Sequence, residues 1–168
     1  MVVPPLAAAH LAAALPGRLA ATAPRVVVVG DAVLDCWMAG PSNRLSREAP
    51  VPVVEIDRTR CAAGGAANTA VNLAALGAQV VLVAPIGDDA DGATVRSLLA
   101  DGGVDTGGLV VDPERHTASK RRILADDALV ARYDSLPAGE IGAPVRAALA
   151  ERLSDALAGG ADAVVVCD

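Results

Sequence analysis

The sequence predicts an α/β fold in which a parallel sheet carries helices on both faces. Two runs of valine, Val26–Val29 and Val164–Val166, are apolar at every position, which is typical of strands buried on both faces. Segments with helical spacing alternate with such strands; the clearest is 142–157, where apolar residues recur at four-residue steps. This alternation predicts parallel neighbouring strands, with the connecting helices packed against the sheet.

Proline and glycine divide the first half of the chain. Residues 1–24 read as an alanine-rich helix, Leu6–Leu15, and a linker. The segment 51–56 alternates and contains proline, which suits an exposed edge strand or a small separate sheet. The remaining elements expected here are a strand at 25–29, a helix from the glycine pair to Gly77, and a strand at 79–84.

The second half continues the same alternation. The acidic cluster around Asp89 and Asp91 lacks the alternate ligands of a calcium loop and is better explained as charge at a helix N-terminus. The expected elements are a helix at 93–100, a strand at 104–111, a hairpin of 117–124 and 128–134 turning at Asp126-Asp127, a helix at 142–157 and a strand at 163–167.

Composition narrows the class of partner. The chain has 168 residues, is 53% hydrophobic and carries a net charge of -6, which argues against nucleic acid as the main partner. It has no apolar run of about 20 residues, so no membrane span is predicted. The three cysteines, Cys36, Cys61 and Cys167, show no paired spacing; we expect them to be reduced, in a cytoplasmic protein.

The stretch Ala63-Gly64-Gly65-Ala66-Ala67-Asn68 is the strongest candidate site. Paired glycines let a ligand approach the backbone closely, and the first N–H groups of the following helix can donate to it. Asn68, one turn in, adds an amide. These features favour a site for a hydroxylated small molecule, although a glycine-rich turn before an ordinary helix remains an equal alternative.

Two carboxylates follow the first strand. Asp31 and Asp35 could both accept hydrogen bonds from sugar hydroxyls, because ligands of open α/β sheets bind at the carboxyl ends of the strands. A turn or helix-capping role is the alternative for Asp31. Asp35 stands among apolar residues and should therefore have a partner.

At this point the sequence resembles the ribokinase-like (PfkB) carbohydrate kinases. The run from Ala63 to Ala70, followed at fixed spacing by Gly77 and Gly87, fits the first signature of that family without mismatch. The segments 30–35 and 40–54 resemble most the kinase domain of the heptose 7-phosphate kinases of the lipopolysaccharide-precursor pathway. The resemblance covers about 25–168 and implies a ribokinase-like three-layer α/β/α fold with a small β lid.

The resemblance also implies roles for individual residues. Asp35 would hold sugar hydroxyls, Gly64 and Gly65 would present backbone N–H groups, and Asn68 would add a side-chain contact. The strands around 51–56 and 118–134 would form the lid, through which members of this family often dimerise. The residues implied for a substrate phosphate are Lys120, the only lysine of the chain, with Arg122 and, more weakly, Arg44; a solvated strand residue is the alternative for Lys120. Asp168, at a strand end, could contact the sugar or its phosphate.

The chain departs from the family pattern in one large respect. Family members carry a later Gly-Ala-Gly-Asp-type segment whose Asp is the general base, and the nucleotide pocket lies in the same half; no Gly-x-Gly-Asp follows Gly87 here. ATP and Mg²⁺ are therefore implied for an intact kinase, with no catalytic base or metal site in this chain. We expect a domain truncated before its nucleotide-binding half, whose substrate is a sugar phosphate.

Two functions remain open from the sequence. The first is the sugar-binding and lid part of an ATP-dependent kinase that converts D-glycero-D-manno-heptose 7-phosphate to the 1,7-bisphosphate. The alternative is a non-catalytic fragment that binds a sugar phosphate or dimerises. A dinucleotide-binding Rossmann protein is disfavoured, because no G-x-G-x-x-G turn follows the first strand.

Overall fold

A parallel sheet forms the body of the molecule. The computed structural model describes residue 17 and residues 20–167, so the helix expected at Leu6–Leu15 and the candidate Asp168 lie outside the described residues. The strands of the body sheet run in the order β10-β1-β6-β7, and all neighbours are parallel. Their bounds are β1 Arg25–Gly30, β6 Gln79–Gly87, β7 Leu109–Asp112 and β10 Ala163–Cys167.

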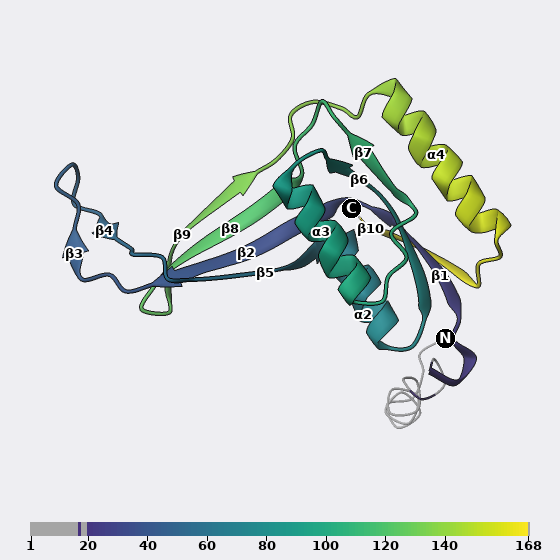
Figure 1. Cartoon of the computed structure of the whole chain (residues 1–168), viewed down its shortest axis with the longest axis horizontal. Helices are drawn as coiled ribbons and strands as arrows, with labels where there is room; N and C mark the ends of the chain where they lie inside the picture. Colours follow the sequence, from purple (N-terminus) through teal and green to yellow (C-terminus); the bar gives the residue numbers. More distant parts are fainter. Residues whose placement is uncertain (1–16, 18–19, 168) are drawn as a thin grey trace, which may run out of the picture.

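Helices cover the body sheet from both sides (Figure 1). Successive side chains of β1 point to opposite faces of the sheet. Val26 and Val28 pack in the core on the side of α2 (Ala66–Ala75) and α3 (Ala90–Asp101). Val27 packs in the core on the side of α4 (Ala143–Ala158). The predicted three-layer α/β/α arrangement is confirmed. None of the described helices is long and apolar enough to cross a membrane.

A second sheet projects from the body (Figure 1), and we call it the lid sheet. Its strands run in the order β5-β2-β8-β9, with β2 and β8 parallel and the other neighbours antiparallel. A two-stranded sheet of β3 (Arg44–Leu45) and β4 (Pro52–Val53) lies at its far end. The lid strands are β2 Ala32–Gly40, β5 Arg58–Gly65, β8 Ala118–Ala125 and β9 Ala128–Ser135.

Most elements agree with the sequence prediction. The 117–134 hairpin is present, and both residues of its turn, Asp126 and Asp127, have positive φ, at 48° and 68°. The small separate sheet near 51–56 is also present. The strand expected at 104–111 is shorter, beginning at Leu109, because the preceding residues make only one isolated bridge to β6.

The strand β2 was not foreseen, and neither was β5. The residues of β5, Arg-Thr-Arg-Cys-Ala-Ala-Gly-Gly, lack the β-branched and aromatic content that signals a strand. Pairing with β2 along the whole of its length stabilises it instead. The glycine pair therefore ends a strand as well as preceding a helix.

The expectation that all three cysteines are reduced is wrong for two of them. Cys36 and Cys61 form a disulfide between β2 and β5, and Cys167 is the free thiol. The antiparallel register places Cys36 directly opposite Cys61, with their Cα atoms 4.1 Å apart. Their separation of 25 positions in the sequence gave no signal, because the pairing depends on the unforeseen strand β5.

Candidate functional site

A cavity of about 450 Å³ opens between the body and the root of the lid sheet. The body contributes Pro85 and Ile86 near the end of β6, and the lid sheet contributes Val33 and Lys120. Gly65 lines the cavity at the start of α2. The cavity therefore lies at the carboxyl ends of the body strands, where open α/β sheets bind their ligands.

The glycine pair is required by two close approaches. A Cβ on Gly64 would lie 2.3 Å from Oδ2 of Asp35 and 3.2 Å from the carbonyl oxygen of Val33. Gly65 has a φ of 58°, and a Cβ there would lie 2.5 Å from the carbonyl oxygen of Asp31. The pair thus lets the Asp35 carboxylate rest directly on the backbone at the entry to α2.

Gly65 is the N-cap residue of α2, and no side chain caps this helix. The Ala66 amide donates to the carbonyl oxygen of Asp31 over 2.9 Å, which ties the helix start to the end of β1. The positive end of the helix dipole consequently faces the cavity that Gly65 and Ala66 line. An electronegative group of a ligand would be stabilised there.

The lid sheet brings Asp35, Lys120 and Arg122 to one face. The register pairs Asp35 with Lys120, and Nη1 of Arg122 donates to Oδ1 of Asp35 over 2.7 Å. The Arg122 guanidinium also lies 4.9 Å from the ring centroid of Trp37, a cation–π contact. The prediction that the Asp35 carboxylate has a partner is therefore confirmed: the partner is Arg122.

Lys120 differs from its neighbours in having no partner. It is half-buried, lines the cavity, and makes no hydrogen bond or ion pair with any described residue. A partly buried ammonium without a counter-ion favours an anionic ligand.

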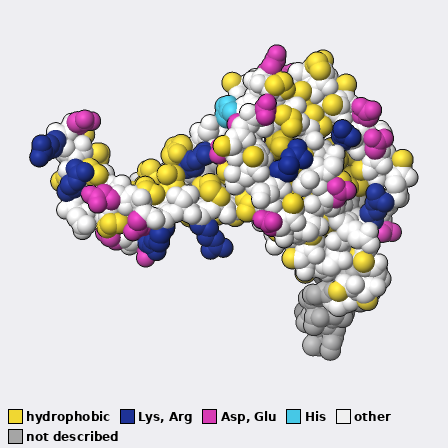
Figure 2. Space-filling model, in the orientation of Figure 1, with side chains coloured by type: hydrophobic (Ala, Val, Ile, Leu, Met, Phe, Trp, Pro, Cys, Tyr) yellow, Lys and Arg dark blue, Asp and Glu magenta, His cyan; other side chains and the backbone are white. Residues whose placement is uncertain are grey.

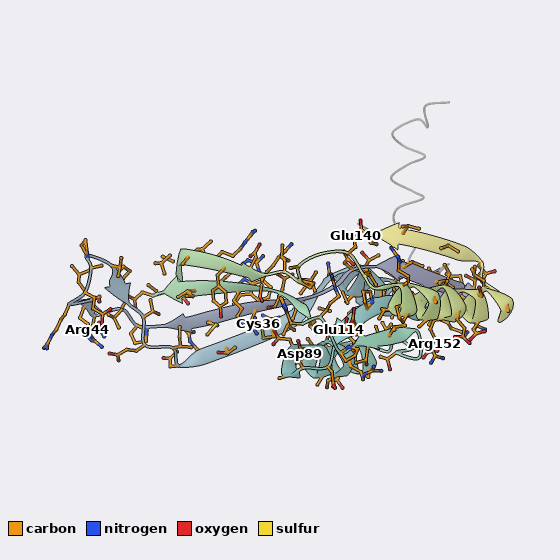
Figure 3. The ribbon with its side chains drawn as sticks, turned by 90° about the horizontal axis from the view of Figure 1, so that it is seen from above. Cys36, Arg44, Asp89, Glu114, Glu140 and Arg152 are labelled. Atoms are coloured by element: carbon orange, nitrogen blue, oxygen red, sulfur yellow. A yellow bond between two sulfur atoms is a disulfide. The ribbon has the colours of Figure 1, made fainter. Side chains whose placement is uncertain are left out.

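Three sequence candidates do not join this group. Asn68 is exposed on α2, where its carbonyl and side-chain oxygens accept from Nδ2 of Asn72 at 2.9 Å and 3.0 Å. Arg44 lies in β3 at the far end of the lid, with Glu55 as a partner at 3.8 Å (Figure 3). Asp168 lies outside the described residues.

Sequence reasoning missed further charged residues on the lid. The register sets Arg60, Trp37, Arg122 and Arg132 in one row across β5, β2, β8 and β9. The adjacent row sets Asp134 opposite Lys120, and Asp134 also lines the cavity. Counting along the hairpin from its turn would have set Tyr133 opposite Lys120, because a bulge between Ile123 and Leu124 shifts the register by one residue and brings Asp134 there instead. No signal could have found Arg60, since β5 was not foreseen.

A second cluster joins the lid to the body beneath the cavity. Asp89 is the N-cap of α3; its carboxylate accepts from the amide of Gly92 and from the amide and hydroxyl of Thr117, over 2.7–2.8 Å. Burial by itself raises the pKa of the Asp89 carboxyl, but these hydrogen bonds, with His116 nearby, hold its pKa below its usual value. Asp89 therefore fixes the start of β8 to the body.

The described residues do not fit a site for magnesium. No group of three or more His, Cys, Asp or Glu side chains among residue 17 and residues 20–167 could hold a metal ion. Of the three carboxylates that line the cavity, Asp112 pairs with Arg115 and Asp134 with Arg132, whereas Asp31 is exposed and makes no ion pair with a described residue.

The fold and this site define an α/β protein with a β lid over a cavity suited to a small polar ligand. Residues 23–139 match the family described as pfkB family carbohydrate kinase. The chain belongs to this family, and the family resemblance drawn from the first signature is confirmed.

Two curated relatives are similar to this chain over more than three quarters of its length. The chain is 42% identical over 131 residues to the bifunctional protein HldE of Helicobacter pylori (strain ATCC 700392 / 26695), covering 78% of this chain and 28% of that protein. It is 40% identical over 148 residues to the bifunctional protein HldE of Citrifermentans bemidjiense, covering 88% of this chain and 30% of that protein. The chain thus spans less than a third of these relatives.

A solved structure supports the same fold. Ribokinase from Cryptococcus neoformans var. grubii serotype A, crystallised in complex with ADP, superposes with a TM-score of 0.53 at 27% identity. The match covers 71% of this chain and 36% of that one. The ribokinase-like fold expected from the resemblance is confirmed.

Proposed function

We propose that this chain is the sugar-binding and lid part of an ATP-dependent kinase that converts D-glycero-D-manno-heptose 7-phosphate to the 1,7-bisphosphate in the cytoplasm, in an ADP-heptose-type precursor pathway. The observation that carries the proposal is Lys120, which has no partner among the described residues, lines the same cavity as Gly65 and is paired in register with Asp35. A cation beside a carboxylate matches a ligand that carries both a phosphate and hydroxyl groups.

Each end of this substrate has a matching group in the chain. Asp35, resting on Gly64, would accept hydrogen bonds from ring hydroxyls, and the start of α2 would add backbone donors. Lys120 would bind the phosphate, with the Arg122 row adding positive charge. These residues bind and orient the sugar; orientation is a large part of phosphoryl transfer, in which the protein mainly positions groups and stabilises charge.

The relatives support the heptose assignment and the nucleotide. For the sugar, the support is the identity of 40–42% to the two bifunctional HldE proteins. For the nucleotide, the support is that a ribokinase of this fold was crystallised with ADP. In the proposed reaction ATP supplies the phosphoryl group, and no described residue is assigned to bind it or its metal ion. The alternative function is a non-catalytic protein that binds a sugar phosphate through the same residues.

Titration calorimetry of the chain tests the proposal and separates the two functions. We expect heptose 7-phosphate to bind more tightly than free heptose. Phosphoryl transfer by this chain when ATP is added would exclude the non-catalytic alternative. If a folded chain binds neither sugar, the proposed function is wrong.

Replacing Lys120 by alanine should discriminate between the two sugars. A lost charge-assisted contact with phosphate weakens heptose 7-phosphate binding by about 10- to 100-fold, while free heptose loses less than about threefold. Arg152, exposed on α4, is the matched control, since Arg152→Ala removes a cation far from the cavity (Figure 3). Equal losses for both sugars would show that Lys120 does not contact the phosphate.

The lid face also supports a homodimer. Figure 2 shows hydrophobic side chains gathered on the lid, and exposed residues there include Val51, Leu129 and Val130. A groove of about 350 Å³ between β4 and the β8–β9 hairpin is lined only by apolar residues. We expect sedimentation equilibrium to show a dimer that Leu129→Glu weakens; a monomer at every concentration would contradict this proposal.

A further inference from the structure

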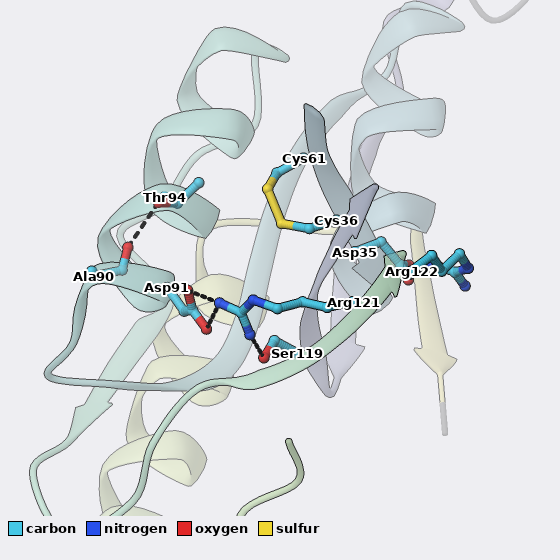
Figure 4. The surroundings of a disulfide bond; sticks show 9 residues. All are labelled: Asp35, Cys36, Cys61, Ala90, Asp91, Thr94, Ser119, Arg121 and Arg122. Atoms are coloured by element: carbon cyan, nitrogen blue, oxygen red, sulfur yellow. Dashed lines mark hydrogen bonds and ion pairs between the residues drawn. A yellow bond between two sulfur atoms is a disulfide. The ribbon is translucent and has the colours of Figure 1, made fainter. Parts of the chain in front are cut away.

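The two faces of β8 carry different groups. Alternation along the strand directs Lys120 and Arg122 to the face of Asp35, and Ser119 and Arg121 to the face of α3. Figure 4 shows Arg121 and Arg122 extending in opposite directions from neighbouring positions. Anything that holds Arg121 in place therefore constrains the two residues on either side of it.

Arg121 is held tightly to the body. Its Nη2 donates to both carboxylate oxygens of Asp91, over 2.7 Å and 2.8 Å, and Asp91 lies in the first turn of α3. Both side chains are largely buried, at 22% and 25% exposed. Arg121 also donates to the hydroxyl of the fully buried Ser119, and its guanidinium lies 6.0 Å from the Tyr133 ring centroid.

This ion pair is the second tie between α3 and β8. The first is Asp89, which accepts from the amide and hydroxyl of Thr117 where β8 begins. Pairing with β2 and β9 holds β8 within the lid sheet, and the two attachments to α3 fix its position relative to the body. Lys120 lies between the two tied positions, so its direction is set by both.

We propose that the Arg121–Asp91 ion pair is a positioning device that, from the opposite face of the lid, holds Lys120 at the cavity and Arg122 against Asp35. Arg121 is a positioning residue: it acts through its neighbours and does not touch the ligand. The part of the proposal that concerns sugar phosphate rests on the proposed function. The part that concerns Trp37 and Arg122 does not.

Trp37 provides a readout that requires no ligand. It is the only tryptophan of the chain, and Arg122 lies over its ring at 4.9 Å. If the ion pair positions the opposite face, Arg121→Gln should change the emission of Trp37 and its quenching by acrylamide. Asp91→Asn and the double variant should give the same change, because all three remove one interaction.

Ligand binding gives the second readout. In calorimetry, Arg121→Gln should reduce the preference for heptose 7-phosphate over free heptose by about tenfold, since a small displacement of Lys120 costs affinity only at the phosphate. Arg121→Lys, which keeps the charge opposite Asp91, should restore most of it. Arg25→Gln is the control: it removes a bond from Nη1 of Arg25 to the carbonyl oxygen of Gly159 at the other end of the body.

Each outcome decides. A lower thermal midpoint in Arg121→Gln with unchanged Trp37 quenching and unchanged sugar preference would show a purely structural ion pair and overturn the proposal. Additive effects of Asp91→Asn and Arg121→Gln would also overturn it. If wild-type chain binds no sugar phosphate, the proposed function fails, and the Trp37 measurements alone then decide whether the ion pair positions the lid face.

Discussion

Replacing Gly64 by alanine is expected to reduce the affinity for both heptose 7-phosphate and free heptose by at least about 100-fold. The new Cβ would lie 2.3 Å from Oδ2 of Asp35, so the carboxylate must rotate away. That rotation breaks the 2.7 Å contact with Arg122 and removes the group proposed to hold the sugar hydroxyls. Because the damage is at the hydroxyl end, the loss should be the same for both sugars, unlike that of Lys120→Ala.

Gly142→Ala is the matched control for this substitution. Gly142 precedes α4 with a φ of -60°, and the nearest atom to a Cβ there is Cδ of Pro144 at 3.7 Å, an ordinary contact. Calorimetry with both sugars and thermal unfolding should be run on the two variants together. Wild-type sugar affinity in a folded Gly64→Ala protein would show that Asp35 does not contact the sugar.

Replacing Asp89 by alanine is expected to lower the free energy of unfolding at pH 7 by about 3 kcal/mol. The change removes the cap of α3 and leaves the amide and hydroxyl of buried Thr117 without their carboxylate acceptor. Asp88→Ala is the matched control, because Asp88 is exposed beside it and makes no such bonds. Urea unfolding of the three proteins measures the difference.

The pH dependence of Asp89→Ala gives an independent check. The folded-state pKa of Asp89 lies below the ordinary value of 3.8, so its stabilisation is fully present above that value. It is lost as the pH falls through the folded-state pKa, where the carboxylate becomes protonated. The stability gap between wild type and Asp89→Ala should therefore narrow below about pH 4; a constant gap from pH 7 to pH 3 would contradict this assignment.

Composition and periodicity were enough to predict several secondary-structure elements of this protein. The valine runs became β1 and β10, the four-residue steps became α4, and the Asp126-Asp127 pair became a hairpin turn, because each depends on local backbone preference or on burial of contiguous residues. The first signature, from Ala63 to Gly87, was specific enough to predict the family.

Contacts between distant segments required the tertiary structure. Strand β5 forms because β2 pairs with it, and that pairing alone decides that Cys36 meets Cys61 and that Arg60 joins the row of Arg122. Arg44 is close in sequence to the site strand β2 yet lies at the far end of the lid, because β2 runs outward from the body.

The sequence by itself determined which residue types were available: a glycine pair, Asp35, and a single lysine followed by two arginines. Only the tertiary structure decided which of them act together. Strand alternation separates Lys120 and Arg122 from Arg121, but the partners on each face, Asp35 on one and Asp91 on the other, come from segments distant in the chain. Side-chain direction follows from local geometry, whereas a side chain's partner depends on register and packing between elements.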